Sequence, residues 1–437
     1  MARQVVCLSL TLLPFDVSAL RAETWSLDRA VATALAGSPD AQMARHRLAG
    51  ARALKQQAEA AGWPQLTLQG RYTQTDSPMM AFGSILNQRA FDFGLDFNHP
   101  GTIDNFNATG TLAFNLYSGG RATAGLAAAR SGARAAEYDL QAAQNQLAAG
   151  VVCAWFTIGK AREAVAAVEA GVKAYEAAVA VPQARFDAGQ MLRADLLSLE
   201  VQLAQTRENL VAARHGAALA DRAFLFVLGL EPAGDPVELA ANDAAPARLV
   251  VPANLDFSAR PELRGLEERV RAAEAMVRVT RGARRPVVNA FASWQYDHGA
   301  QTGRGSDSWL AGVSADFNVF DGGSNAGKIR ASEADLALAK EILRKTRLGL
   351  RLEVEQARLA HDQAVERLAV TARAVEQAAE SAALTRARFE QGSLLTADLI
   401  GGEGRLIEAR MRRAVAMADE RIAVAELRRA LGLPPLP

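Results

Sequence analysis

The chain has 437 residues, of which 50% are hydrophobic and 22% are charged. Its 49 basic and 48 acidic residues leave a formal net charge of +1, so bulk electrostatics give no reason to expect a nucleic-acid partner. Apart from the N-terminal segment, no run approaches the roughly 20 apolar residues of a membrane-spanning helix, which argues against a helical inner-membrane protein.

The N-terminal segment has the character of a secretory signal peptide. Arg3 precedes an apolar stretch over residues 5–15, and small residues offer cleavage after Ala19 or after Ala22. We therefore expect residues 1–22 to be removed from an exported protein. A buried N-terminal strand is the alternative interpretation, because the positive region is a single arginine.

Two segments with alternating polarity follow a first helical stretch. Over residues 66–72 and 106–116 the apolar side chains fall on one face, while Asn107 and Thr109 lie on the other. Strands of roughly 9 to 12 residues with aromatic residues towards their ends are typical of lipid-facing barrel strands. An ordinary half-buried hairpin is the alternative. Residues 77–105, between the two strands, are expected to form a long irregular loop.

A very long helix is predicted next. From Ser118 to about Val181 the sequence is dominated by Ala, Leu, Glu, Gln and Arg, and proline is absent until Pro182. At 1.5 Å per residue such a helix runs about 95 Å, which exceeds the diameter of a globular domain of this size. A cytosolic coiled coil would share this composition, but it would not explain the alternating segments.

A turn motif, RF-x2-G-x5-D, ends the first long helix. Arg185 and Phe186 lie at the helix end, and Gly189 permits the positive φ of a tight turn. Asp195 opens the returning helix, where a carboxylate favours the positive end of the helix dipole. A pure turn-and-cap role is the alternative explanation for this aspartate.

Most of this pattern occurs twice. The segments FNLYSGG (114–120) and ARFDAGQMLRADLL (184–197) return 203 residues later as FNVFDGG and ARFEQGSLLTADLI, with no gap between them. We therefore divide the chain into a first repeat (23–230), a linker (231–257) and a second repeat (258–437). Earlier matches are 222 residues apart, so 222 minus 203, or 19, extra residues belong to the first repeat's loop.

The second repeat carries alternating segments over 288–296 and 309–319, a long helix from Asp321 to about Leu384, and a second turn. Three glycines within Gly401–Gly404 of its returning helix cost about 3 kcal/mol relative to alanine. They predict a soft turn that eases bending of this helix.

Four strands cannot close a barrel, because even small single-chain barrels use about eight strands, and an open edge in lipid leaves backbone groups unsatisfied. The pattern therefore predicts an oligomer. Three chains would pool twelve strands, and their long helices would form a hollow cylinder beneath.

The doubled layout, the strand-to-helix FNxxxGG segments and the doubled turn motif resemble the TolC family of outer-membrane efflux and secretion channels. The implied fold class is mainly α with a small antiparallel β portion. The resemblance implies a homotrimer with a twelve-stranded barrel in the outer membrane of a Gram-negative bacterium and an α-helical barrel across the periplasm. Its expected partners are outer-membrane lipid, a periplasmic adaptor and an inner-membrane transporter of RND, ABC or MFS type.

The same resemblance places both turns at the periplasmic tip. It assigns gate positions at the tip to Arg185, Asp195, Arg388, Asp398 and Gly401. It assigns an adaptor-docking surface to Gly189, Met191, Leu192, Gly392, Leu394 and Leu395. Asp398 from three protomers would ring the pore and attract cations. Some family members carry a second carboxylate and a bracing arginine where this chain has Gly401 and Leu394, so a different gate is expected here.

The function expected is passive conduction of substrates from an inner-membrane pump, in efflux or type I secretion. A periplasmic coiled-coil adaptor or scaffold that never enters the membrane is the alternative. The five histidines are scattered without metal-ligand spacing, and neither a phosphate loop nor a nucleophile elbow occurs. We therefore predict no enzyme activity, no metal and no cofactor. Drug, metal-ion, solvent and protein export all fit the sequence.

Overall fold

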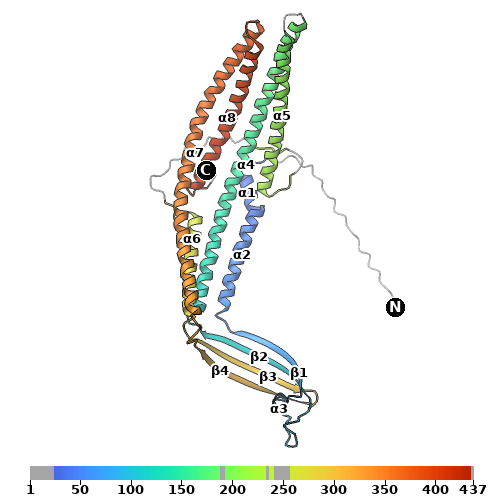
Figure 1. Ribbon diagram of the computed structural model, residues 1–437, viewed down its shortest axis with the longest axis vertical. Helices are drawn as coiled ribbons and strands as arrows, with labels where there is room; N and C mark the ends of the chain where they lie inside the picture. The colour runs from blue at the N-terminus through green and yellow to red at the C-terminus, as the bar shows by residue number, and fades with distance from the viewer. Residues whose placement is uncertain (1–23, 188–191, 233–235, 241–255, 435–437) are drawn as a thin grey trace, which may run out of the picture.

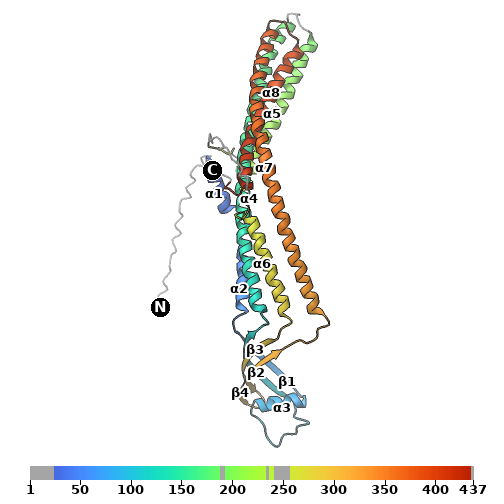
Figure 2. The same ribbon diagram turned by 90° about the vertical axis from the view of Figure 1, so that its left-hand side faces the viewer.

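The computed structural model describes residues 24–187, 192–232, 236–240 and 256–434. The predicted signal peptide and much of the linker lie outside these ranges. The described chain is elongated, with a four-stranded sheet at one end and two helical hairpins reaching the other end (Figures 1 and 2). The elements of the first repeat are α1 (Leu27–Gly37), α2 (Pro39–Ala60), β1 (Gln65–Thr75), α3 (Pro78–Asn87), β2 (Ile103–Tyr117), α4 (Arg121–Asp187) and α5 (Arg193–Leu228). Those of the second repeat are α6 (Pro261–Gly282), β3 (Val287–Gly299), β4 (Arg304–Asp316), α7 (Ser324–Glu390) and α8 (Thr396–Ala430).

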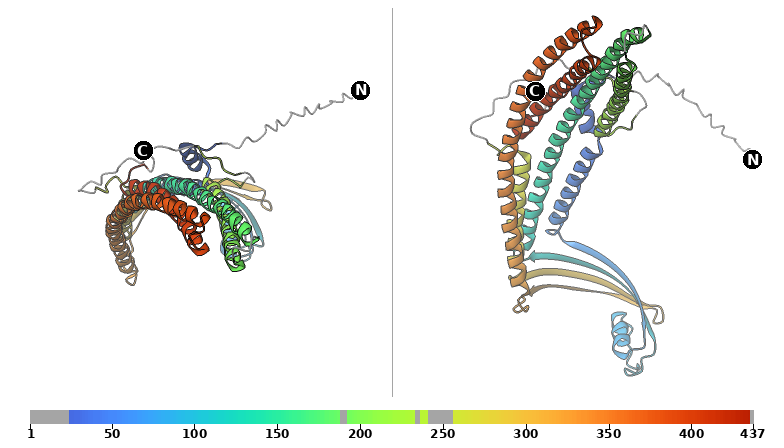
Figure 3. Two further views of the ribbon diagram at one scale, coloured as in Figure 1. Left: turned by 90° about the horizontal axis from the view of Figure 1, so that it is seen from above. Right: turned by 45° about the horizontal axis from the view of Figure 1, so that its top comes forward.

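The two repeats build helices of matching length. Both α4 and α7 have 67 residues, about 100 Å each at 1.5 Å per residue, and the returning helices α5 and α8 have 36 and 35. The expected long helices are confirmed, and α4 continues through Pro182 to Asp187. Seen from above, the helices lie along an arc rather than in a closed bundle (Figure 3, left).

The strands form one antiparallel sheet in the order β1-β2-β3-β4. The pairing of β2 with β3 joins the two repeats, while β1 and β4 occupy the edges. Apolar side chains are exposed on one face of the sheet, as the alternation predicted; these are Leu66, Leu68, Tyr72, Phe106, Leu112, Trp294, Trp309 and Val313. On the other face, Asn105 and Asn107 donate amide hydrogen bonds to one carboxylate oxygen of Asp297, at 2.6 and 2.9 Å.

Two sequence expectations about this sheet are wrong. The segment 77–105 is not an irregular loop, because it contains α3 and the first residues of β2. Pro78 starts α3 at a position where a missing N–H is tolerated, and Ala81 and Ile85 give it a buried face. The second strand of the later pair ends at Asp316 rather than continuing to residue 319, since its partner β3 begins only after Pro286, which cannot donate a ladder hydrogen bond.

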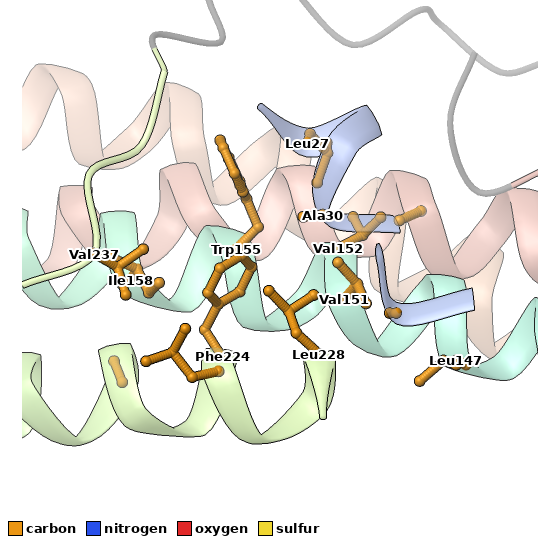
Figure 4. Packing of buried hydrophobic residues seen from close by; sticks show 14 of the residues in the cluster. Leu27, Ala30, Leu147, Val151, Val152, Trp155, Ile158, Phe224, Leu228 and Val237 are labelled. Atoms are coloured by element: carbon orange, nitrogen blue, oxygen red, sulfur yellow. The ribbon is translucent and has the colours of Figure 1, made fainter. Parts of the chain in front are cut away.

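The largest core cluster lies at mid-height, where α1, α4 and α5 meet (Figure 4). The ring of Phe224 packs edge-on against both Trp25 and Trp155, with centroid separations of 6.1 and 6.0 Å. Leu228 lies in the same cluster. A second cluster joins α6, α7 and α8 around Val354. These clusters pack the short helices α1 and α6 against the long ones.

None of the helices in the described ranges combines the length and hydropathy that a bilayer-spanning helix needs.

Candidate functional site

The far ends of the two hairpins form the helical tip. At the tip of the second hairpin, where α7 turns into α8, the hydrogen-bonding pattern requires one residue in the left-handed backbone conformation. Gly392 has φ 77°, its N–H donates to the carbonyl of Phe389, and the N–H of Ser393 donates to the carbonyl of Arg388 at 3.0 Å. These two bonds satisfy carbonyls that the ended helix leaves free, as in a Schellman motif. Glycine fits here because any side chain would strain the positive φ.

The returning helices begin in the same way at both tips. Leu192 and Leu395 are the N-cap residues, and each accepts a backbone hydrogen bond from an aspartate three residues later, Asp195 or Asp398, at 3.1 Å. Both aspartates therefore lie in the first helical turn, as predicted. There their carboxylates interact favourably with the positive end of the helix dipole. Asp398 is exposed and Asp195 is half-buried.

The residues expected to bind an adaptor differ in their exposure. Leu192 and Leu395 are 72% and 74% exposed, although both are large and apolar. Leu394 instead is partly buried and packs against a small hydrophobic core behind the turns. Gly189 and Met191 fall outside the described residues.

The two arginines of the turn motifs lie in the last turns of α4 and α7. Arg388 is exposed. Only the backbone position of Arg185 is described.

All four long helices meet in one small core just behind the turns, which we term the tip cluster: Tyr175, Ala178, Leu199, Phe389 and Leu399. Tyr175 comes from α4, Leu199 from α5, and the other two large side chains from α7 and α8. The cluster therefore ties the first hairpin to the second near the point where the family resemblance places the gate.

Sequence reasoning missed the polar contacts around this cluster. The fully buried Tyr175 donates its hydroxyl to the backbone carbonyl of Ile400 at 3.0 Å, which links α4 to α8. Burial, and secondarily the carboxylate of Glu403, raise the pKa of Tyr175 to about 12, so this hydroxyl remains a donor at neutral pH.

Glu403 itself is 1% exposed and lies between two of the three glycines of α8. Arg386 on α7 donates from Nε, at 3.0 Å, and from Nη2 to its Oε1 atom. Its Oε2 atom is buried and has no hydrogen-bond partner among the described residues. A buried carboxylate held by a single arginine is costly to leave unpaired. The one signal in the sequence was a glutamate set among glycines.

The glycines of this segment do not break α8, which is continuous from Thr396 to Ala430. A Cβ atom added at Gly401 would approach only Arg405, at 3.6 Å, and one added at Gly402 would meet Thr385 at 3.5 Å. Both are ordinary van der Waals distances. Close packing therefore does not require glycine at either position, and the cost to helix stability has to be explained otherwise.

Comparisons with known proteins agree with this architecture. The sequence profile of the outer membrane efflux protein family matches residues 30–230 and 257–433, so the chain belongs to this family. No curated protein matches the chain.

Several solved structures share the fold. The outer-membrane channel OprN is 23% identical, with a TM-score of 0.80, over 94% of this chain and 91% of that one. VceC of Vibrio cholerae is 20% identical (TM-score 0.77; 93% and 96% covered). CmeC of Campylobacter jejuni is 15% identical (TM-score 0.82; 93% and 85% covered). The fold class expected from the sequence is confirmed.

The protein is therefore an outer-membrane efflux channel whose helical part extends into the periplasm. The alternative of an adaptor or scaffold that never enters the membrane is not favoured. The family and the structural neighbours are channel proteins.

Proposed function

We propose that three copies of this chain assemble into the exit duct of a tripartite efflux pump or type I secretion system. A sheet of four strands has two unpaired edges, β1 and β4, and an apolar face that is exposed in the single chain. Three such sheets joined edge to edge would supply twelve strands and satisfy every edge in lipid. The helices of one chain lie along an arc (Figure 3, left), which supports the same assembly, because three such arcs would complete a tube.

The equal lengths of the two hairpins carry the proposal about the tip. Because α4 matches α7, and α5 differs from α8 by one residue, both turns end at the same height. Six near-equivalent tips would then surround the pore. We propose that Leu192 and Leu395, exposed at every tip, contact a helical hairpin of the periplasmic adaptor, together with Gly189, Met191, Gly392 and the edge of Leu394.

The gate, in this proposal, lies beside the tip cluster. Asp398 is exposed in the first turn of α8, so three copies would place a ring of negative charge near the closed end and attract cations. Gly401 follows one turn later, and in this proposal α8 bends there when the tip opens. Arg388, and Arg185 at the equivalent position, flank the ring. Asp195, being half-buried, serves mainly to stabilise the first turn of α5 through the helix dipole.

The assembly is tested in outer-membrane fractions. We expect an oligomer that resists dissociation in detergent until heated, contains about three chains, and conducts ions in single steps after insertion into planar bilayers. A soluble monomer without β-sheet signal in lipid would overturn the proposal. A soluble protein without β-sheet signal in lipid is the result expected for an adaptor or scaffold.

Docking is tested by placing charge at the exposed leucines. Leu192→Glu combined with Leu395→Glu should abolish cross-linking to the cognate adaptor, while the oligomer stays intact. The matched control is Leu352→Glu. Leu352 is also exposed, but it lies on α7 far from the tips. Undiminished cross-linking in the double variant would show that these leucines are not the docking surface.

A further inference from the structure

The extra segment of the first repeat folds into an ordered element at the outer end of the sheet. One face of α3 is buried, with Ala81, Ile85 and Gln88 at spacings of four and three residues. The helix contacts β2, β3 and β4 and so lies across the sheet rather than beyond it. It is seen on the concave side of the strands in Figure 3, right.

Hydrogen bonds identify the face of the sheet that α3 covers. The amide of Gln88, which is fully buried, donates to the carbonyl of Asp104 at 2.8 Å and to the side chain of Asn105 at 3.0 Å. Asn105 in turn donates to Asp297 at 2.6 Å. These two side chains belong to the polar face. Thus α3 lies on the face opposite the exposed apolar residues.

The turn between β3 and β4 holds the same glutamine from the other side. Thr302 donates its hydroxyl to Oε1 of Gln88 at 2.7 Å. Gly299, at the end of β3, has no room for a Cβ atom, because that atom would collide with Oε1 of Gln88. Arg304 adds a hydrogen bond to the carbonyl of Arg89, the residue after the helix C-cap, at 3.2 Å. Contacts from β2 and from the β3–β4 hairpin therefore hold the C-terminal end of α3 in place.

The rest of the segment packs back onto the helix. Phe82 of α3 makes edge-on contacts with Phe91 and Phe97, with ring centroids 6.0 and 5.0 Å apart. Such aromatic pairs favour one arrangement over many. The outward face of α3 remains uncovered, with Met79 81% exposed.

We propose that α3 is a built-in constriction of the outer mouth and sets the largest solute that can pass. This inference rests on the proposed oligomeric duct. If lipid contacts the apolar face, the polar face lines the bore, and each chain contributes one α3 to the inside of the ring of strands. Gln88 is the residue that holds it there, because its side chain joins α3 to β2 and to the β3–β4 turn.

The test measures access to a cysteine placed deeper on the polar face. Ser293→Cys lies four residues along β3 from Asp297, about 13 Å further from the mouth, in a background where Cys153 is replaced by serine. Intact cells are treated from outside with a small maleimide or with a maleimide carrying a bulky polymer. Four chains are compared with a matched control: the parent, Gln88→Ala, Gly299→Ala, and one with residues 76–102 replaced by Asn-Gly, since Thr75 pairs directly with Ile103. Asn87→Ala, an exposed amide on the same helix, is the matched control.

We expect the small reagent to label all chains alike. The bulky reagent should label the shortened chain and the Gln88→Ala and Gly299→Ala chains at least about tenfold faster than the parent and the Asn87→Ala control. Equal labelling of parent and shortened chain by the bulky reagent would overturn the constriction while leaving the duct intact. Failure of the small reagent to reach the introduced cysteine in the shortened chain would instead overturn the bore, and the proposed assembly with it.

Discussion

Alanine at Gly401 and Gly402 together is predicted to keep the tip closed. These glycines are helical, inside α8, so the wild-type chain accepts a weaker helix at this point. We attribute that weakness to opening: α8 bends here when the tip widens. A stiffer segment should then open less often, while assembly of the oligomer is unaffected.

The magnitude follows from the local geometry. The distances of 3.6 and 3.5 Å to the nearest side-chain atoms show that both Cβ atoms fit without displacing a neighbour, so no packing penalty offsets the gain in helix propensity. Each glycine-to-alanine change is worth about 1 kcal/mol in a helix interior. The pair therefore favours the straight helix by about 2 kcal/mol, which corresponds to a roughly 30-fold lower open probability if opening breaks the helix at both positions.

Single-channel recording in planar bilayers measures this directly. The control is a double alanine variant at Gly216 and Gly349, two helix-interior glycines with nothing within 4 Å of an added Cβ atom. It gains the same propensity far from the second tip. Wild-type opening in the Gly401→Ala, Gly402→Ala channel would refute the soft-turn hypothesis. An equal loss of open probability in the control would show that helix stiffness matters but that its location in the chain does not.

Further predictions concern four side chains. Arg386→Ala should lower the free energy of unfolding by about 3 kcal/mol, which is the low end for breaking a buried ion pair because Arg386 is partly exposed. Arg386→Lys should recover part of this loss. An unchanged thermal unfolding midpoint of Arg386→Ala in detergent would contradict the prediction. Phe224→Ala should cost about 3 to 5 kcal/mol by opening a cavity beside Trp155, and Phe224→Leu much less; similar unfolding curves for both would show that the site relaxes. Asp398→Asn should weaken block by multivalent cations added on the periplasmic side, and unaltered block would remove Asp398 from the pore. Burial, and secondarily the carboxylate of Glu426, raise the pKa of the Cys153 thiol to about 11. The rate at which Cys153 reacts with maleimide should therefore rise about tenfold per pH unit up to about pH 11. A rate that levels off near pH 9 would show that the thiol is not buried as described.

Most of the fold can be predicted from the repetition in the sequence. Because a constant offset of 203 residues allows no insertion, it required helices of equal length in both copies, and α4 and α7 have the same length. Period-two alternation likewise located the strands. Both signals arise from geometry that repeats along the chain, which is why they survive without any knowledge of tertiary contacts.

The unrepeated parts were harder to predict. The first exterior segment has no counterpart in the second repeat, and its glycines and aromatic residues concealed the short helix α3, whose placement depends on Gln88 reaching β2 and the β3–β4 turn. At the tip, the motif located Gly392 and Asp398 from local backbone rules. The link from Arg386 to Glu403 depends on the register of α7 against α8, which no local rule specifies.

We propose that β1 of one chain pairs with β4 of the next and so closes a barrel of three chains. Cysteine cross-linking in outer membranes tests it most directly, with one cysteine at Gln69 on β1 and a second at Ser308, Leu310 or Ser314 on β4, all in a chain without Cys153. We expect one of the three pairings to give covalent dimers and trimers under mild oxidation, and nothing larger, because a closed ring has three junctions. Absence of cross-links at every pairing, or a ladder that continues beyond three chains, would contradict it.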